Sequence, residues 1–487
     1  MSETTHPSVN GPQQPRRVLT LLDAVCLIVG TIIGAGIFET TPQIAAQAGG
    51  IYWLMALWLL GGLLALIGAV CFAELTTANQ NAVGGDYVYL KKATGRPLAF
   101  LFAWAAFWVI RPGNIAAMAM IFARYFDEIV PIPGDSVVPH PLLVYAFLAV
   151  VLLSAANLIG MHQGKWVQNF LTITKVTGIL IIVGLAFLFP AEASFAQPST
   201  PLTGGSILLA MVLIMFTFGG WNDISFVAAE IKTPQKNLFR SLVIGTLGVT
   251  AIYVLINLAF CVGLGYEAMA SSQAVAADVV KETLGTNSLI GLESSRFVSA
   301  LVCISCLGAI NGIILTSPRI YFAAGQDYPQ LGILGRWDRK RDLPWPATMA
   351  QVAVTVGLLL VCYICTNEKT DAFFVILITT APVFWLFLGI TALTVIILRF
   401  RPASRSSTSG HPSPATPENA PVFRVPLFPL PPLILAVACF AMVYTSVEFL
   451  ILNKFWLAAG LIGTIMLIGI GLAVVLKPQP ETPGGQD

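Results

Sequence analysis

Residues 19–50 read LTLLDAVCLIVGTIIGAGIFETTPQIAAQAGG, a mostly apolar segment with Gly30, Gly34 and Gly36 near its middle. The segment is longer than the ~20 apolar residues that an α-helix needs to cross the ~30 Å hydrocarbon core of a membrane. Glycine inside a helix costs ~1 kcal/mol relative to alanine. We therefore predict a membrane helix that unwinds around Gly34, and unwound backbone at that depth is tolerated only where it lines a cavity.

The composition indicates that most of the chain lies in a membrane. Of its 487 residues, 56% are apolar and 10% are charged, and the mean hydropathy is +0.81, whereas a soluble domain has about 25% charged residues. Apolar stretches of spanning length predict an all-α polytopic membrane protein with twelve transmembrane helices. The predicted helices cover residues 19–48, 51–77, 98–125, 141–160, 164–190, 205–229, 239–265, 295–325, 347–366, 372–399, 427–448 and 455–476.

Basic residues in the loops predict the orientation of these helices. One set of alternate loops, together with both tails, carries most of the lysines and arginines, including Arg16, Arg17, Lys91 and Lys92. The opposite set of loops carries only Arg124, Lys281, Arg296, Lys369 and Lys454. Since basic loops stay in the cytoplasm, we expect an integral plasma (inner) membrane protein with both termini cytoplasmic.

Polar segments flank the predicted helices. We predict cytoplasmic tails at residues 1–17 and 477–487, the first of them disordered. Residues 401–426 are rich in proline, serine and threonine and are predicted to form a cytoplasmic linker. The linker divides a ten-helix transport core (18–400) from two C-terminal helices (427–476). The first tail has no apolar stretch, so we predict no cleavable signal peptide.

The sequence gives little indication of a metal site, a cofactor or an enzyme. All eight cysteines lie in predicted helices, and the zinc-like spacing of Cys303/Cys306 and Cys362/Cys365 has no histidine nearby. We interpret them as small core residues and expect no metal site and no cofactor. No outer loop carries a cysteine, so we expect no disulfide-linked ancillary subunit. The four histidines lie in tails or loops, which argues against an enzyme, and nothing indicates a nucleic-acid partner.

The sixth predicted helix contains a second break. Residues 207–230 read ILLAMVLIMFTFGGWNDISFVAAE, with Gly219 and Gly220 in mid-segment. Interrupted helices at corresponding positions of two halves are typical of transporters built from inverted repeats, which bind substrate at the membrane midplane. The alternative for the first helix is that Gly30 and Gly34 only permit close helix packing, as G-x-x-x-G motifs do.

The two breaks together offer both kinds of hydrogen-bonding group that a zwitterion requires. Amide N–H groups at the start of a helix suit a carboxylate; here they belong to Gly34, Ala35 and Gly36. Carbonyl oxygens freed by unwinding suit an ammonium group; here they belong to Ile32, Ile33, Phe216 and Phe218. This complementarity predicts an amino-acid substrate.

Several motifs occur in one order along nearly the whole chain. They are GTIIGAGIF at 30–38, AEL and GGDYVYL within 73–90, IRP at 110–112, FGGWNDISFVAAE at 218–230 and AINGIILTSPRI at 309–320. This set resembles the amino acid–polyamine–organocation superfamily, and within it the L-type amino acid transporter family. The resemblance implies the leucine-transporter-like fold, in which a five-plus-five inverted repeat precedes two C-terminal helices, and it implies alternating access.

The resemblance also implies roles for particular residues. It places substrate-carboxylate contacts on Gly34, Ala35 and Gly36. It places amino-group contacts on the Ile32 and Phe216 carbonyls and near Gly219. The Phe216 ring matches a gate over the substrate, Asn222 a supporting position and Trp385 the approach of the tenth helix. On position alone, Phe216 has the alternative of ordinary packing.

Charged side chains inside predicted helices are expensive and therefore functional candidates. Lys175 lies about eleven residues into the fifth helix, too deep for its ammonium to reach water easily. The resemblance implies that this lysine replaces the sodium ion of sodium-coupled relatives, near the Val29 and Gly30 carbonyls and Ser305. A purely structural lysine is the alternative. Arg111, before Pro112 in the third helix, is interpreted as structural or gate-related.

Three positions depart from the family pattern. Ala35 stands where serine is usual, which removes a hydroxyl but leaves the N–H group. Glu39 and Asp223 stand where uncharged residues are usual. Each acid could contact water in an outer vestibule, sense protons, or attract a cationic substrate. Gly219 places no acid against the pocket.

These observations predict a sodium-independent transporter of neutral L-amino acids that works by alternating access, with exchange favoured over proton-coupled uptake. The alternative is a carrier of the same fold for cationic amino acids, polyamines or another organic cation. A channel would require a filter repeat, which the sequence lacks.

Overall fold

The computed structural model describes residues 15–132, 141–190, 204–285, 293–365, 372–401 and 423–479. The predicted tail and linker residues 1–14, 402–422 and 480–487 lie outside this range. In the described part, eleven helices are long and apolar enough to cross a membrane, and the all-α polytopic prediction is confirmed. The twelfth predicted helix is α17 (Trp345–Cys365), whose apolar part, Trp345–Val361, is shorter.

The observed helices begin and end within a few residues of the predicted ones. The uninterrupted spans are α4 (Ile51–Ala78), α8 (Pro141–Ile159), α9 (Met161–Leu188), α11 (Pro234–Leu264), α17, α18 (Ala372–Phe400), α19 (Leu430–Leu452) and α20 (Trp456–Val475). The third span combines α6 (Arg96–Ala105), the π-helix η1 (Ala106–Ile110) and α7 (Arg111–Ile129), and the eighth combines α15 (Ser294–Thr316) and α16 (Pro318–Asp327).

Both predicted breaks are present. The first helix divides into α1 (Leu21–Ile32) and the short segments α2 (Gly36–Glu39) and α3 (Thr41–Ala48). The sixth divides into α10 (Gly204–Thr217) and the 3₁₀ segment η2 (Trp221–Glu230). Each break falls on a glycine cluster, where the sequence predicts that a continuous helix is least stable.

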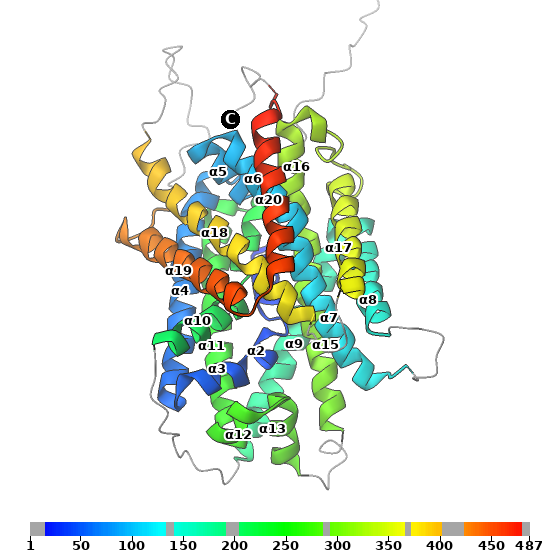
Figure 1. Cartoon of the computed structure of the whole chain (residues 1–487), viewed down its shortest axis with the longest axis vertical. Helices are drawn as coiled ribbons and strands as arrows, with labels where there is room; N and C mark the ends of the chain where they lie inside the picture. Colours follow the sequence, from blue (N-terminus) through cyan, green and yellow to red (C-terminus); the bar gives the residue numbers. More distant parts are fainter. Residues whose placement is uncertain are drawn as a thin grey trace, which may run out of the picture.

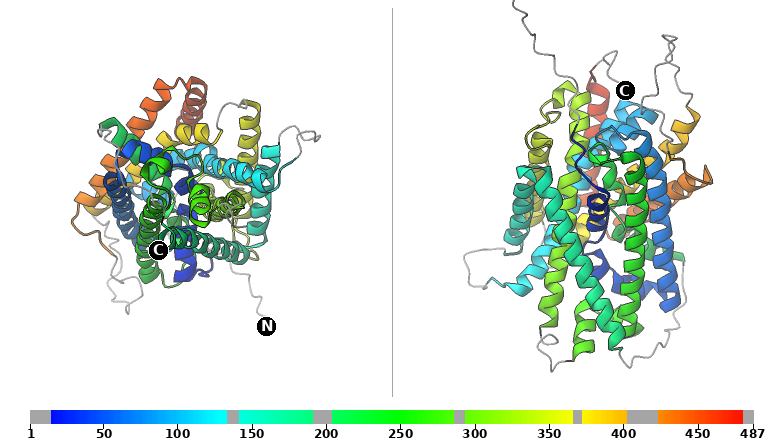
Figure 2. Two further views of the ribbon diagram at one scale, coloured as in Figure 1. Left: turned by 90° about the horizontal axis from the view of Figure 1, so that it is seen from below. Right: turned by 180° about the vertical axis from the view of Figure 1, so that it is seen from behind.

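The molecule is a bundle elongated along its helices, with the two ends of the described chain near one end of it (Figures 1 and 2). The backbone N–H of Arg16 donates to Asp342, beyond α16, and that of Gln479 donates to the carbonyl of Asp327, the last residue of α16, so both ends contact the region around the end of α16. We call this the terminal end. The short helices α12 (Tyr266–Ser271) and α13 (Val275–Leu284) lie at the opposite end (Figure 1).

The chain before α1 is joined to the end of η2. Leu19 forms a parallel bridge with Ile231, through hydrogen bonds from Leu19 N–H to the Glu230 carbonyl (2.9 Å) and from Lys232 N–H to the Leu19 carbonyl (2.8 Å). The Glu230 side chain also forms an ion pair with Arg319 of α16, with 2.8 Å between Arg319 Nε and Glu230 Oε1. These bonds connect the first, sixth and eighth spans at the terminal end.

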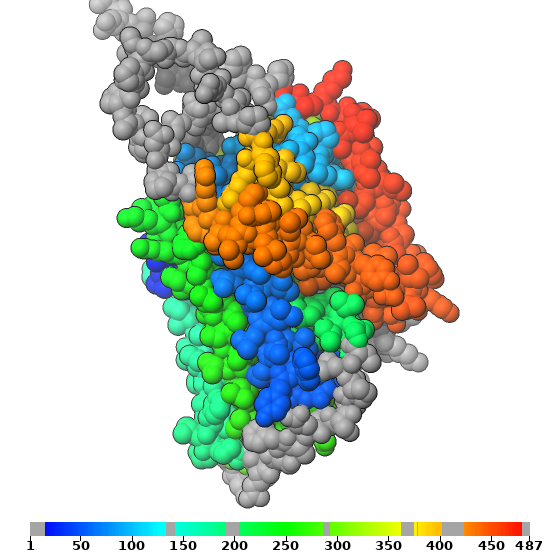
Figure 3. Space-filling model, turned by 90° about the vertical axis from the view of Figure 1, so that its left-hand side faces the viewer, coloured from blue at the N-terminus to red at the C-terminus, as the bar shows by residue number. Residues whose placement is uncertain are grey.

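The two C-terminal helices lie on the outside of the bundle. α19 packs mainly on α18 and crosses the face that α4 and α10 present, as the space-filling view shows (Figure 3). α20 packs against α6. Much of the α20 surface is exposed and apolar, as expected of a helix that faces lipid. The broken first and sixth helices lie nearer the centre of the bundle.

One short helix at the terminal end has no counterpart among the predicted spans. α5 (Asp86–Thr94) follows α4, and its residues Asp86, Tyr87, Tyr89 and Leu90 are buried. Gly84 and Gly85, both at positive φ, bring this turn against α16 and η2, where a Cβ would lie 2.7 Å from Ala323 and 2.5 Å from Ser225. The GGDYVYL motif therefore packs against η2, the second part of the sixth span.

Candidate functional site

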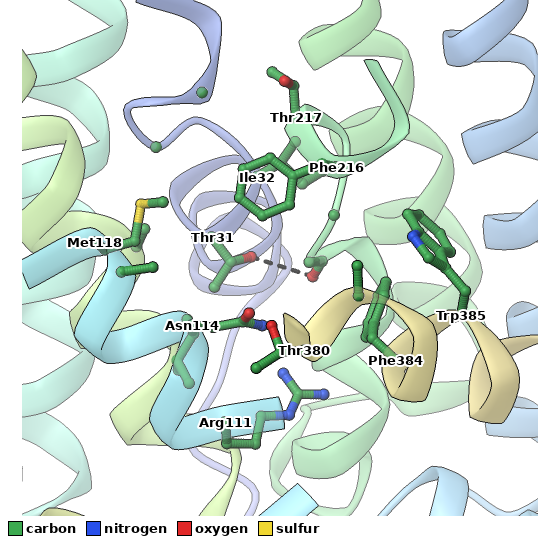
Figure 4. A pocket seen from close by; sticks show the side chains of 18 of the residues that line it. Thr31, Ile32, Arg111, Asn114, Met118, Phe216, Thr217, Thr380, Phe384 and Trp385 are labelled. Atoms are coloured by element: carbon green, nitrogen blue, oxygen red, sulfur yellow. Dashed lines mark hydrogen bonds between the residues drawn. The ribbon is translucent and has the colours of Figure 1, made fainter. Parts of the chain in front are cut away.

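One cavity lies between the two breaks (Figure 4). Its volume of about 100 Å³ is several times the ~10–15 Å³ that one water needs by the same kind of measure. Residues from both breaks line it, together with residues of α7, α10, α15 and α18. Of the residues predicted from sequence, those in the lining are Ile32, Gly34, Gly36, Phe216, Gly219, Trp385, Arg111 and Asp223.

The helix-one break presents free amide groups beside this cavity. Among the described residues, the N–H groups of Ala35, Gly36 and Ile37 donate to no backbone carbonyl. The N–H of Gly34 does not share this freedom, because it donates to the Ile32 carbonyl at 2.9 Å. The predicted carboxylate-binding set therefore shifts by one residue, and its free N–H groups begin at Ala35.

The two breaks contact each other directly. Gly220 has φ +113°, a conformation that side chains other than glycine rarely adopt. Its carbonyl accepts from the Thr31 hydroxyl at 3.2 Å, the hydrogen bond drawn in Figure 4. A Cβ at Gly36 would lie 3.1 Å from the Thr217 hydroxyl. Close approach of the two unwound segments thus depends on glycine at both.

A tyrosine that the sequence did not single out connects the same two segments. Tyr253 of α11 is fully buried. Its hydroxyl lies 3.1 Å from the Ile32 carbonyl and 3.0 Å from the Thr217 carbonyl, one on each side of the site. Because Ile32 O accepts from both Gly34 N–H and Tyr253, it is less available to a ligand than predicted.

Lys175 has contacts close to those predicted. Its side chain is fully buried, and its ammonium donates to the carbonyls of Gly30 (2.9 Å), Ile33 (2.6 Å) and Ser305 (3.0 Å). Gly30 and Ser305 were anticipated, whereas Ile33 takes the place of Val29. The Ile33 carbonyl, predicted to face the substrate, is therefore directed at Lys175, and Ile33 does not line the cavity.

The sequence left two interpretations for the glycines of the first helix, close helix packing and unwinding at a binding site. A Cβ at Gly30 would lie 2.1 Å from Gln168 and 2.3 Å from Thr172, so Gly30 permits close packing against α9. Gly34 and Gly36 lie at the break and line the cavity. Gly30 therefore serves packing, and the predicted binding role of Gly34 and Gly36 stays a prediction.

Arg111 and Asp223 form a buried ion pair in the cavity wall. Their side chains are 2.7 Å apart, and the exposed fraction is 5% for the arginine and 2% for the aspartate. The guanidinium also stacks over the Phe226 ring at 4.8 Å. Asp223 therefore lines the cavity as a nearly fully buried carboxylate that is paired with Arg111 through one oxygen.

The remaining predicted residues divide between the cavity and its surroundings. Phe216 and Trp385 lie on its wall, where Figure 4 shows the Phe216 ring beside Ile32. Asn222 is buried behind the wall, and its side chain hydrogen-bonds to Asp86. Glu39 lies farther along the first helix and pairs with Arg124 of α7.

Sequence reasoning missed part of the wall. The added residues are Thr31, Asn114, Ala117, Met118, Val212, Leu213, Thr217, Gly220, Ala309, Ile313, Ile378, Thr380, Ala381, Phe384 and Ser446. Most belong to regular helices, where no local sequence signal separates a cavity residue from a core residue. Asn114, one turn after Arg111 in an apolar segment, was the one polar signal that could have been noticed.

Comparison with known proteins gives a consistent picture. The model of the family described as amino acid permease matches residues 19–471. The chain is 31% identical over 406 residues to the b(0,+)-type amino acid transporter 1 of Mus musculus, covering 82% of this chain and 79% of that protein. It is 29% identical over 397 residues to the large neutral amino acids transporter small subunit 2 of Oryctolagus cuniculus, covering 79% and 70%.

Proposed function

Since this chain belongs to the amino acid permease family and is a membrane transporter of amino acids, not an enzyme, we propose that it carries neutral L-amino acids without sodium. Transport proceeds by alternating access, with exchange of one amino acid for another. The observation that carries this proposal is the cavity between the two breaks. Its wall contains Gly36, whose N–H group donates to no backbone carbonyl among the described residues, on one side and the turn around Gly219 on the other.

The backbone of the substrate is held by the breaks. The free N–H groups of Ala35, Gly36 and Ile37 are directed to the substrate carboxylate, because amides at a helix start carry partial positive charge. The substrate ammonium group contacts carbonyl oxygens at the sixth-helix break, near Phe216 and Gly219. Phe216 and Trp385 act as gates because both are bulky and line the cavity.

Sodium independence is supported by Lys175. Its ammonium already contacts three carbonyl oxygens from the first and eighth spans, which are the hard oxygen ligands that a small cation would use. A second cation at this place would meet a like charge in a medium of low dielectric constant.

Preference for neutral side chains is supported by the charges in the cavity wall. Arg111 and Asp223 neutralise each other, and Gly219 carries no acid. Among the described residues of the wall, a cationic side chain would therefore find no carboxylate that lacks an arginine partner. The name of one relative, large neutral amino acids transporter small subunit 2, agrees with this preference.

The same proposal includes location and partners. The basic loops predicted to be cytoplasmic join the terminal end, so both termini are cytoplasmic and the protein is inserted in the plasma (inner) membrane. Cys26, Cys71, Cys261, Cys303, Cys306 and Cys439 are free and buried. These six of the eight cysteines, together with outer loops that are predicted to contain no cysteine, support a protein that works without a disulfide-linked subunit.

The test is uptake by proteoliposomes containing the purified protein. Labelled neutral, cationic and acidic amino acids and a polyamine are offered outside, with the vesicle interior either empty or loaded with unlabelled amino acid. We expect uptake of neutral amino acids, strong stimulation by internal amino acid, and equal rates in sodium and choline buffers. Uptake that needs sodium, or that favours the polyamine, would contradict the proposal.

A further inference from the structure

The ion pair in the cavity wall belongs to a larger cluster of buried charges. Asp86 of α5 is 3% exposed, and Arg111 and Asp223 are 4% and 1% exposed. Asn222, the residue before Asp223, hydrogen-bonds the Asp86 carboxylate. Two acids and one arginine therefore share a buried region beside the cavity, and their formal charges sum to −1.

Several polar atoms of this cluster have no partner. Within the described residues, Asp86 Oδ1, Asp223 Oδ2 and Arg111 Nε are buried and make no hydrogen bond. An unpartnered carboxylate oxygen in a buried site is costly unless it binds a proton or a cation. Two carboxylates with one counter-charge favour the state in which one of them is neutral.

The surroundings supply no further positive charge. The groups facing Asp86 are Arg111 of α7, Asp223 of η2 and the neutral phenol Tyr89 of its own helix. From α16, Tyr321 faces the Arg111–Asp223 pair.

The other ionisable groups on the neighbouring elements have partners of their own. Arg319 pairs with Glu230, and Asp327 binds Lys91 and Tyr87. Arg399, the ionisable residue of α18, pairs with Glu74. Lys92 lies in the last turn of α5, at the opposite end of that helix from Asp86, and Arg96 of α6 donates to the Gln479 carbonyl.

We propose that Asp86, Arg111 and Asp223 form a proton-binding site behind the cavity, which holds one proton on its two carboxylates and thereby keeps the substrate pocket free of net negative charge. When the proton leaves, the cluster carries one negative charge, and two of its members line the cavity. That charge repels the carboxylate of an incoming amino acid, so substrate binding weakens.

The pKa of Asp86 supports the position of this proton. Burial raises it from the ordinary 3.8 to about 7, against the opposing effect of Arg111 and with that of Asp223. The native state then binds more protons than the unfolded state between these two values. Stability contributed by this proton is present at acidic pH and is lost as pH rises toward 7.

The inference rests on the proposed transport function, and it is tested by the pH dependence of KM for a neutral amino acid. For the natural protein we expect KM to rise by about tenfold from pH 6 to pH 8, since a group titrating near 7 goes from about 90% to about 10% protonated. Asp86→Asn, which resembles the protonated acid, should remove this dependence and hold KM at the acidic value throughout.

The matched control is Asp327→Asn, which removes another acid from the terminal end, one that is already paired with Lys91. We expect its pH profile to follow that of the natural protein. An identical pH profile in Asp86→Asn and the natural protein would overturn the proton site while leaving amino-acid transport intact. Absence of any amino-acid uptake would instead count against the proposed function.

A second measurement does not depend on the variant folding. In weakly buffered detergent solution at pH 7.5, binding of a neutral amino acid to the natural protein should take up protons, because substrate and proton favour each other reciprocally. A pH-sensitive dye reports the change. Substrate binding that is seen by a thermal shift but moves no protons would contradict the site.

Discussion

Two buried cations lie near the same cavity, and they are compensated in different ways. Lys175 is surrounded by carbonyl dipoles of the first and eighth spans, whereas Arg111 contacts the ionised side chain of Asp223. A carbonyl cannot gain or lose a proton at ordinary pH, but a carboxylate can. The Lys175 region therefore contains no carboxylate that could exchange a proton, whereas the Arg111 region does.

The comparison is tested most severely by Arg111→Met. Removal of the arginine leaves two buried acids without a counter-charge, and breaking a buried pair in this way costs about 3–5 kcal/mol. We expect a loss of that size in unfolding free energy, measured by denaturation in detergent micelles. Arg296→Met is the matched control, since Arg296 forms an exposed pair with Glu293, and a loss as large there would sink the argument.

For Lys175→Met we expect a large loss of transport and only a small loss of stability. The carbonyls left behind are neutral, and the protein is relieved of a buried charge, so we expect a loss of only about 1–2 kcal/mol of stability. Transport in proteoliposomes should fall at least about tenfold. Ile173→Ala, on the exposed side of the same helix, serves as control. Normal transport by Lys175→Met would contradict a role of the Lys175 ammonium in transport.

Tyr253→Phe sharpens the comparison at the junction of the two breaks. It removes the hydroxyl that bridges the Ile32 and Thr217 carbonyls, with an expected cost of about 1 kcal/mol and a several-fold rise in KM. Tyr266→Phe removes a buried hydroxyl that binds Gly50 and Ala45 instead. We expect a similar stability loss there but an unchanged KM; equal KM effects would show that the bridge is not specific.

The smallest effect is expected for Glu39→Gln. Its partner Arg124 is 43% exposed, and exposed ion pairs contribute about 0–1 kcal/mol. At each pH between 6 and 8, transport by Glu39→Gln should differ from that of the natural protein by less than about twofold, so the variant keeps the pH profile that Asp86→Asn removes. Loss of the pH dependence of transport in Glu39→Gln would instead identify Glu39 as the pH-sensitive group.

Much of the fold was predictable because its signals are local. Twelve apolar segments, two glycine clusters and one deep lysine can each be recognised without knowing the tertiary structure, and Gly30 and Ser305 were correctly expected beside Lys175. The π-helix η1 and the short helix α5 were not expected, since neither has an apolar length that a membrane requires.

The electrostatic pairing was less predictable because it joins distant positions. Arg111 and Asp223 are 112 positions apart, and the sequence suggested a role for each without placing them together. The cost of a lone charge at mid-membrane was the available clue, since it favours pairing of opposite charges. Tyr253 offered no clue, because one tyrosine in an apolar helix is compatible with ordinary packing.

The join between Leu19 and Ile231 has a mechanical consequence. α1 and η2 are joined at the terminal end by two backbone hydrogen bonds, and the two spans are joined again at the breaks by Tyr253 and Thr31. We therefore expect α1 and η2 to move together when the transporter changes conformation. The glycines of the two breaks would permit this movement, and the Arg319–Glu230 pair, which joins η2 to α16, would oppose it.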